Sequence, residues 1–195
     1  MKKKTFILTV LLVVILLCAS CFILDALRHS QEKEITSLKA KIIPLEFTLL
    51  KNDQYMEVKY SFLDIAGQPV CSKTETLRGN ELFIDCVVKQ LNNDIKVAFP
   101  VILYSNVIPA AEGIVLVQEY NNNGFPEIFH GVSAKEKKHL ERIYAEVLQE
   151  INDTEAFRSS PHIMASTTKT TYQLVARIRG GLEIIKAEKQ AKSQD

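Results

Sequence analysis

The sequence has no excess of charge of either sign. Its 195 residues include 24 basic residues (Lys and Arg) and 23 acidic residues (Asp and Glu), for a formal net charge of +1. No run of like charge is longer than the three lysines that follow the first methionine. Proteins that bind nucleic acid through its phosphates normally carry a basic patch or stripe. The charge balance therefore predicts no nucleic-acid partner.

Motifs for nucleotide and metal binding are also missing. The chain contains neither a G-x-G-x-x-G loop nor a Walker loop, the motifs that cradle the phosphates of a nucleotide. Its four histidines share no metal-ligand spacing with one another or with a cysteine. No internal repeat, low-complexity segment or family motif spans the chain. We therefore expect no cofactor and no bound metal.

One catalytic motif does occur, in the stretch "ASTTKTT" that begins at Ala165. Ser166 and Lys169 have the S-x-x-K spacing of serine acyl-enzymes. Those enzymes hold the serine at a helix N-terminus and need further S-x-N-type and K-T-G-type elements. Only a short segment follows Lys169, and the surrounding threonines favour a strand over a helix. We interpret the motif as a chance match and predict no catalytic residue and no enzyme.

Charge is absent from residues 5–24, which are mostly Leu, Ile, Val and Phe. As a helix rising about 1.5 Å per residue, this segment would cover about 30 Å, the hydrocarbon thickness of a bilayer. The lysines before it favour a cytoplasmic N-terminus at residues 1–4. We therefore predict a single-pass anchor at residues 5–24 with the following domain exported. The short, lysine-led segment favours a bacterial inner (cytoplasmic) membrane and a periplasmic or other extracytoplasmic domain.

Two alternatives for the apolar segment stay open, a cleaved signal peptide and a lipoprotein signal. The stretch "LLCASC" loosely matches a lipobox, with Ala19 and Ser20 before Cys21 as the lipidated residue. Against a lipoprotein, Cys18 stands where a larger aliphatic residue is usual, and the apolar run continues past Cys21. The C-x-x-C spacing of Cys18 and Cys21 is not interpreted as redox-active, because reactive thiols need an exposed, polar setting.

Residues 25–42 predict a helical stalk. They are rich in helix formers and contain no Gly or Pro, and Pro44 marks the expected end of the helix. Ile35, Leu38 and Ile42 recur at heptad-like spacing over a length too short for an independent coiled coil. The pattern leaves two interpretations open, a lone stalk and self-association of the chain through the stalk.

Residues 43–186 predict an exported α+β domain, a mostly antiparallel sheet with one packed amphipathic helix, followed by a polar tail at 187–195. Ser133 and Glu136 form a capping box before the helix. Pro100 predicts either an edge strand or two shorter strands around it. In a hairpin around Gly180 and Gly181, a three-residue loop would place Ala176 opposite Ile184. The expected strands are residues 56–63, 70–77, 82–88, 95–105 and 113–120 and this hairpin at 171–185.

Cys71 and Cys86 raise the question of a disulfide, which an exported domain allows. A two-residue turn at Arg78–Gly79 would pair the two cysteines across a hairpin. The same register, however, puts Lys73 and Glu75 on the core face. A three-residue loop gives better apolar patterning and moves the cysteines to opposite faces, and only a bulge would reconcile the two arguments. A disulfide and two buried free thiols therefore both stay open.

Two long connections, residues 105–113 and 120–131, are candidate partner-binding loops because binding residues concentrate on loops. The aromatic candidates are Tyr120, Phe125 and Phe129, with burial in the core as the alternative. The main functional hypothesis is a membrane-anchored, non-enzymatic binding module whose partner is another envelope protein. The alternatives are an extracytoplasmic carrier or sensor of a small apolar ligand, also conceivable as a lipoprotein, and an enzyme of unrecognised type.

Overall fold

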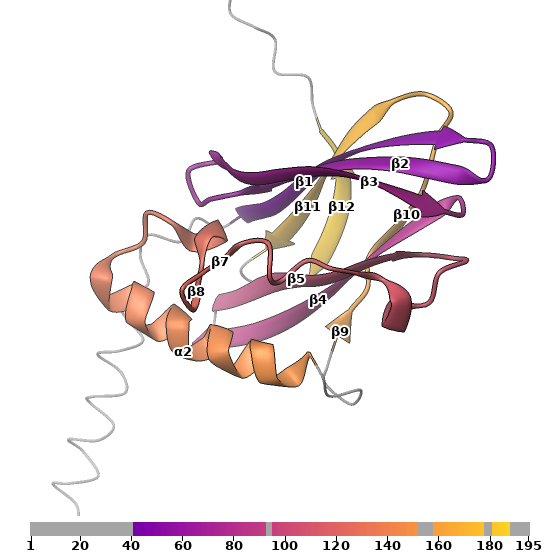
Figure 1. Ribbon diagram of the computed structural model, residues 1–195. Helices are drawn as coiled ribbons and strands as arrows, with labels where there is room; N and C mark the ends of the chain where they lie inside the picture. The colour runs from indigo at the N-terminus through magenta and orange to yellow at the C-terminus, as the bar shows by residue number, and fades with distance from the viewer. Residues whose placement is uncertain (1–40, 93–94, 152–157, 178–180, 188–195) are drawn as a thin grey trace, which may run out of the picture. The chain divides into compact units, whose positions relative to one another are not determined.

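The computed structural model describes residues 41–92, 95–151, 158–177 and 181–187 (Figure 1). The chain divides into two compact units, residues 1–36 and 37–195, and every described residue belongs to the second. The predicted anchor, Cys21 and nearly all of the stalk lie outside the described residues, as does the tail from residue 188. Within the described part, no helix has the length and apolar character needed to cross a membrane.

The described residues form mostly antiparallel β-structure with one α-helix, in agreement with the predicted α+β class. Sheet A consists, in spatial order, of β12 (Leu182–Lys186), β11 (Thr170–Arg177), β1 (Lys41–Asn52), β2 (Tyr55–Leu63) and β3 (Pro69–Arg78). Sheet B consists of β10 (His162–Met164), β4 (Glu81–Asn92), β5 (Ile95–Ser105) and β6 (Ile114–Val115), with β9 (Arg158–Ser159) also paired to β4. Every strand pair in the two sheets is antiparallel.

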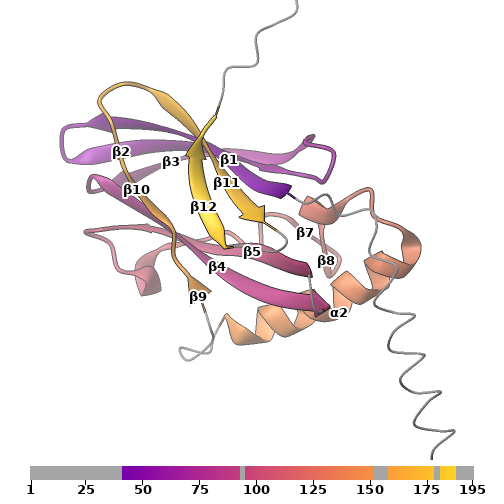
Figure 2. The same ribbon diagram turned by 180° about the vertical axis from the view of Figure 1, so that it is seen from behind.

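Shorter elements and the helix complete the domain. They are the 3₁₀ turns η1 (Ala110–Glu112) and η2 (Glu127–Phe129), the small ribbon of β7 (Asn121–Asn122) and β8 (Phe125–Pro126), and the helix α2 (Ala134–Glu150). Sheet B lies between sheet A and α2 in both views of the ribbon (Figures 1 and 2). The domain is therefore layered, with sheet on sheet and the helix on the far side of sheet B.

The core between the sheets is made by alternating side chains. On β2, Met56, Val58, Tyr60 and Phe62 are fully buried while the residues between them are more exposed, as the period-two pattern predicted. Neighbouring β1 adds Leu45, Phe47 and Leu49 in register. Sheet B contributes buried Leu82, Ile84 and Leu103. Removal of these apolar surfaces from water is the main force that holds the two sheets together.

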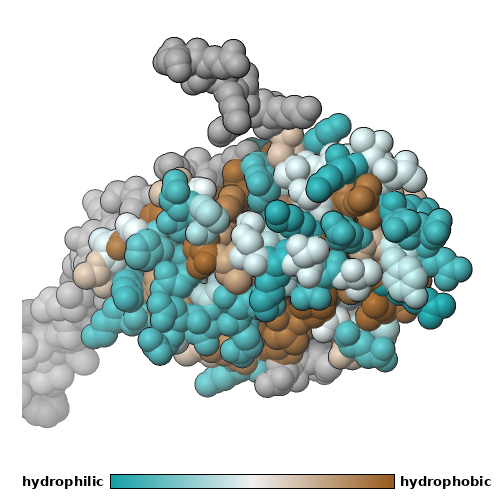
Figure 3. Space-filling model, turned by 45° about the horizontal axis from the view of Figure 1, so that its top comes forward, coloured by the Kyte–Doolittle hydropathy of each residue, from teal (hydrophilic) through white to brown (hydrophobic). Residues whose placement is uncertain are grey.

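The outer side of sheet A is polar by comparison. The residues of β2 that alternate with the core positions include Glu57, Lys59 and Ser61. Figure 3 turns the upper, sheet A side of Figure 1 toward the viewer and shows a largely hydrophilic surface with separate hydrophobic patches. An antiparallel sheet with one packed and one solvated face has this alternation.

The helix α2 begins where the capping box predicted. The Ser133 hydroxyl accepts the N–H of Glu136, and the Glu136 carboxylate accepts the N–H of Ser133. Its apolar stripe, which includes Leu140, Tyr144 and Val147, is buried. Tyr144 stacks on Phe99 of β5 with ring centroids 5.9 Å apart, which joins the helix to sheet B.

The predicted hairpin between the strands of Cys71 and Cys86 is wrong. The two strands, β3 and β4, belong to different sheets, and both cysteines are free thiols. The chain turns from one sheet to the other at Gly79, which has a φ of 121° and is buried. A Cβ on Gly79 would lie 2.5 Å from the side-chain oxygen of Asn106, so only glycine fits this corner.

Pro100 does not interrupt its strand. It lies inside β5, beside a β-bulge where the register with β4 shifts between Asp85 and Cys86, and β6 pairs with β5 only farther along, at Ile102 and Leu103. The expectation of two short strands is therefore wrong, whereas the alternative of an edge strand agrees with the pairing at Pro100. A bulge and an unpaired strand side are the two settings in which a sheet accepts a proline, and Pro100 has both among the described residues.

Other differences concern boundaries and register. β1 starts at Lys41 and contains Pro44, so the last two residues of the predicted stalk are strand. Of the strand expected at 113–120, only the two residues of β6 are extended and paired. In the last hairpin Ala176 pairs with Leu182 and not with Ile184, a shift of two residues that keeps the same side chains on the same face.

Candidate binding surface

The outer face of sheet B has two parts with different surroundings. Near α2, Phe99 is fully buried between Phe129, with ring centroids 5.4 Å apart, and Tyr144. At the other end of the strands the outer residues are not fully covered by the described chain. We call this second part the open face; it consists of Glu81, Phe83, Tyr104, Val115, His162 and Met164.

Three aromatic rings form a row across the open face. His162, Phe83 and Tyr104 are directly opposite one another on β10, β4 and β5. Phe83 stacks on Tyr104 at 5.2 Å with a 14° interplanar angle, and on His162 at 5.2 Å with a 28° angle. Rings that stack across neighbouring strands stand upright on the sheet. They therefore present mainly their edges to a partner, a geometry that suits packing against protein side chains better than stacking on a flat base or sugar.

Exposed apolar side chains lie on both sides of this row. Met164 on β10 is 65% exposed and Val115 on β6 is 46% exposed. Scattered apolar residues are normal on a protein surface, whereas a contiguous patch with a polar rim is typical of an interaction site. Methionine is well suited to such a site because its flexible thioether adapts to the shape of a partner.

The charge on the open face is acidic and sparse. The Glu81 carboxylate lies 3.5 Å from Nε2 of His162. Asp85, the next outward residue after Phe83 on β4, is buried and accepts a hydrogen bond from the Ser160 hydroxyl. The residues that define the open face include no lysine and no arginine. A partner that carries a basic residue beside apolar ones would complement it.

A polar cluster on the inner side of sheet A was not expected from the sequence. The Tyr60 hydroxyl donates to Glu119, and Lys73 forms an ion pair with the same carboxylate at 2.9 Å. Burial, reinforced by the charge of Glu119, raises the pKa of Tyr60 well above its ordinary value. The hydrogen bond and charge of Glu119 likewise raise the pKa of Lys73. Every member has a partner, so the cluster clamps two parts of the fold together rather than offering an unfilled site.

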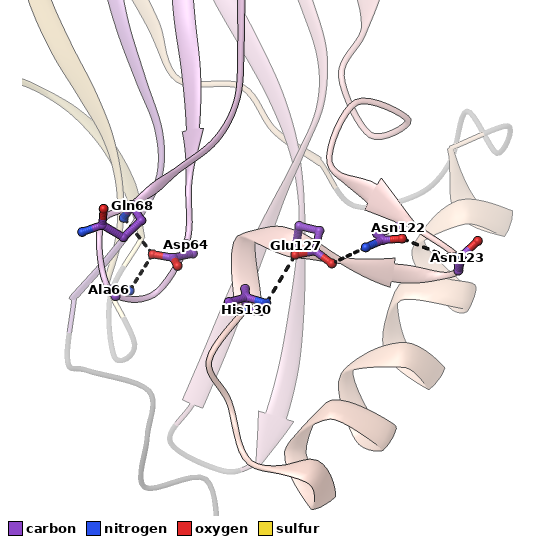
Figure 4. A network of polar contacts seen from close by, with 7 residues as sticks. All are labelled: Asp64, Ala66, Gln68, Asn122, Asn123, Glu127 and His130. Atoms are coloured by element: carbon purple, nitrogen blue, oxygen red, sulfur yellow. Dashed lines mark hydrogen bonds and ion pairs between the residues drawn. The ribbon is translucent and has the colours of Figure 1, made fainter.

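A second polar network lies at the end of the domain where loops meet (Figure 4). The Asp64 carboxylate accepts the backbone N–H groups of Ala66 and Gln68, which closes the turn between β2 and β3. Nearby, Glu127 accepts from the Asn122 side chain and lies 3.4 Å from Nδ1 of His130. These contacts are local and shape the loops. Among the residues that the structure describes, no group of three or more His, Cys, Asp or Glu side chains is placed to hold a metal ion.

The aromatic residues that the sequence suggested as partner-binding loop residues are buried in the core. Tyr120, Phe125 and Phe129 are 1%, 5% and 1% exposed, so their side chains are not offered to a partner. The Tyr120 hydroxyl donates to the carbonyl of Pro100, and its ring contacts Phe62 at 4.8 Å. Their burial agrees with the alternative in which they complete the core. The candidate partner-binding residues are instead those of the open face.

The remaining candidates are also accounted for. Ser166 lies between β10 and β11 and not at a helix N-terminus, and its hydroxyl accepts the N–H of Thr168. Lys169 is exposed in the same connection. Cys86 is fully buried, which raises the pKa of its thiol, and Cys71 is half-buried on the other sheet. The placement of Ser166 lacks the helix that an S-x-x-K nucleophile requires.

Comparison with known proteins gives no relative: no family model, no curated protein and no solved structure matches this chain.

Proposed function

We propose that this chain is a single-pass membrane protein whose exported domain is a non-enzymatic binding module. Its partner is another protein of the same bacterial envelope, and it docks on the open face of sheet B. The observation that carries the proposal is the row of stacked rings with exposed Met164 and Val115 beside it. The apolar segment 5–24 supports the membrane anchor, which raises the effective concentration of the domain for other membrane proteins.

The chemistry of the open face defines the partner. Its apolar centre favours a partner surface of aliphatic or aromatic side chains. The half-buried carboxylate of Glu81 belongs to this face and favours a lysine or arginine opposite it. The interior supports a surface site over an internal one, because the inner faces of the two sheets are filled with fully buried side chains such as Phe47 and Phe62. That packing counts against a carrier of a small apolar ligand.

The test is affinity capture with the full-length chain in detergent, in matched variants. Met164→Asp places a charge on the open face at an exposed position, so the fold should tolerate it. Tyr55→Asp is the control, because Tyr55 is 51% exposed but belongs to sheet A. We expect a partner retained by the wild-type chain and by Tyr55→Asp and reduced at least tenfold in Met164→Asp. Equal recovery with both variants would contradict docking on the open face.

A further inference from the structure

The border of sheet A is an unusually long free strand. β3 is last in the sheet and pairs only with β2, and no described residue pairs with its second side (Figures 1 and 2). The other unpaired borders among the described strands are shorter: β12 has five residues, β10 three, β6 two, and β5 is unpaired on one side over residues 95–100, whereas β3 has ten. Short borders are one way in which proteins prevent unwanted strand pairing. β3 therefore needs another device, or a partner.

Two charged residues on β3 provide such a device. Lys73 and Glu75 are opposite Tyr60 and Val58 of β2, so their side chains belong to the inner side of sheet A. Charges that point inward on a border strand discourage pairing with an arbitrary strand, because they would meet apolar residues. Lys73 is already held by Glu119, whereas Glu75 has no ion-pair partner within 4.0 Å among the described residues. A strand that places a basic residue opposite Glu75 and an acidic residue opposite Lys73 would pair with β3 without this cost, because each charge would meet an opposite charge.

The strand β3 of a second copy of this chain meets that requirement. When two copies of β3 run antiparallel with Thr74 opposite Thr74, Lys73 of each copy meets Glu75 of the other. Ser72 then meets Thr76, which keeps polar residues together on the outer side. A shift of one residue would put the charged side chains on opposite sides of the sheet, and a shift of two would pair like with like. Only the register centred on Thr74 forms both ion pairs.

We propose that β3 pairs with β3 of a second copy, in this register, to give a two-fold dimer with one continuous sheet across both domains. The interface is isologous, since each copy contributes the same residues. The inference does not depend on the open face, which belongs to the other sheet.

The first test is disulfide trapping in the full-length chain in detergent. Thr74→Cys brings two thiols together at the centre of the register, where facing Cα atoms are about 4.5–5.5 Å apart. Thr76→Cys is the matched control, because residue 76 faces residue 72 and its own copy is too far away. We expect a covalent dimer from Thr74→Cys well above the level of the wild type and of Thr76→Cys. A mixture of Ser72→Cys and Thr76→Cys chains should also crosslink. Equal crosslinking of Thr74→Cys and Thr76→Cys would overturn the register.

The second test is charge reversal, followed by light scattering. Glu75→Lys leaves the ion pair of Lys73 with Glu119 intact, so the fold should persist, but it opposes two lysines across the interface. We expect the dimer of the wild type to become at least tenfold weaker in Glu75→Lys. A wild-type monomer, or a dimer that Glu75→Lys leaves unchanged, would overturn the proposal. A dimer that Glu75→Lys leaves unchanged would indicate self-association through the predicted stalk instead.

Discussion

The hydroxyl of Tyr60 donates to the Glu119 carboxylate, with distances of 3.2 and 3.1 Å to its two oxygens. Tyr60 is on β2 of sheet A, and Glu119 follows β6, the last strand of sheet B. Lys73 of β3 holds the same carboxylate from the border of sheet A. One acidic side chain therefore ties two strands of sheet A to the segment that leaves sheet B.

Removal of the Tyr60 hydroxyl should weaken this tie. Tyr60→Phe keeps the ring in the core but removes a hydrogen bond to a charged group, so we expect the free energy of unfolding to fall by about 1–2 kcal/mol. Urea unfolding of the full-length protein, followed by far-ultraviolet circular dichroism, measures it. Tyr55→Phe, at an exposed tyrosine, is the control and should change little. Equal stability of Tyr60→Phe and the wild type would contradict the clamp.

Buried tyrosines should make the domain sensitive to alkali. Burial raises the pKa of Tyr60, Tyr120 and Tyr144 above the ordinary value near 10. Above about pH 10 the unfolded chain releases these protons while the folded chain keeps them, so stability falls as the pH rises. At neutral pH these tyrosines are protonated in both the folded and the unfolded chain, so they do not make the stability depend on pH there. Absorbance at 295 nm and circular dichroism should show their ionisation coinciding with unfolding. Tyrosinate absorbance from all three in a folded protein would be the contrary result.

The two cysteines of the domain should differ in reactivity. Cys86 is fully buried and burial raises the pKa of its thiol, whereas Cys71 is half-buried. The thiolate is the reactive form, so Cys86 should resist alkylation in the native protein. A short iodoacetamide treatment, followed by peptide mass spectrometry, should label Cys86 only after denaturation. Recovery of a Cys71–Cys86 disulfide from unreduced protein would contradict the free state of both thiols and would mean that a covalent bond joins β3 of sheet A to β4 of sheet B.

The cap of α2 offers a stability test far from the proposed surfaces. Ser133→Ala removes the acceptor of the Glu136 N–H, and we expect a loss of about 1 kcal/mol in the free energy of unfolding. Thermal unfolding of Ser133→Ala beside Thr167→Ala, an exposed threonine in a connection, measures the difference. A loss of the same size in both variants would mean that the cap contributes nothing specific.

Elements with a strong local period were predictable from the sequence. β2 follows from its alternating residues and α2 from its apolar stripe and the capping box at Ser133. The sheet in which a strand belongs was not predictable in the same way. The sequence of β3 and β4 favours a hairpin, but the strand pairing places them in different sheets, and the chain changes sheets at Gly79, where Asn106 leaves no room for a Cβ. No local pattern of residues 78–81 contains that contact.

The surface candidates were the least predictable part. Phe125 and Phe129 are in loops that look exposed, yet tertiary packing buries both. Conversely, Phe83, Tyr104 and His162 come from separate strands, and only the strand pairing brings their rings together. A signal was present in the outward alternation of Phe83 with buried Leu82 and Ile84, but its neighbours depend on the topology. Tyr60 and Glu119 are likewise brought together only by the tertiary fold, which no local pattern predicts.

The open face of sheet B, as we propose, contacts another envelope protein in the cell. The most direct measurement places a photo-crosslinking phenylalanine analogue at position 164 of the full-length chain, with position 55 on sheet A as the matched site, and irradiates intact cells. We predict one discrete adduct of constant mass from position 164 and none from position 55. No adduct from position 164, or the same adducts from both positions, would show that the open face is not the docking surface.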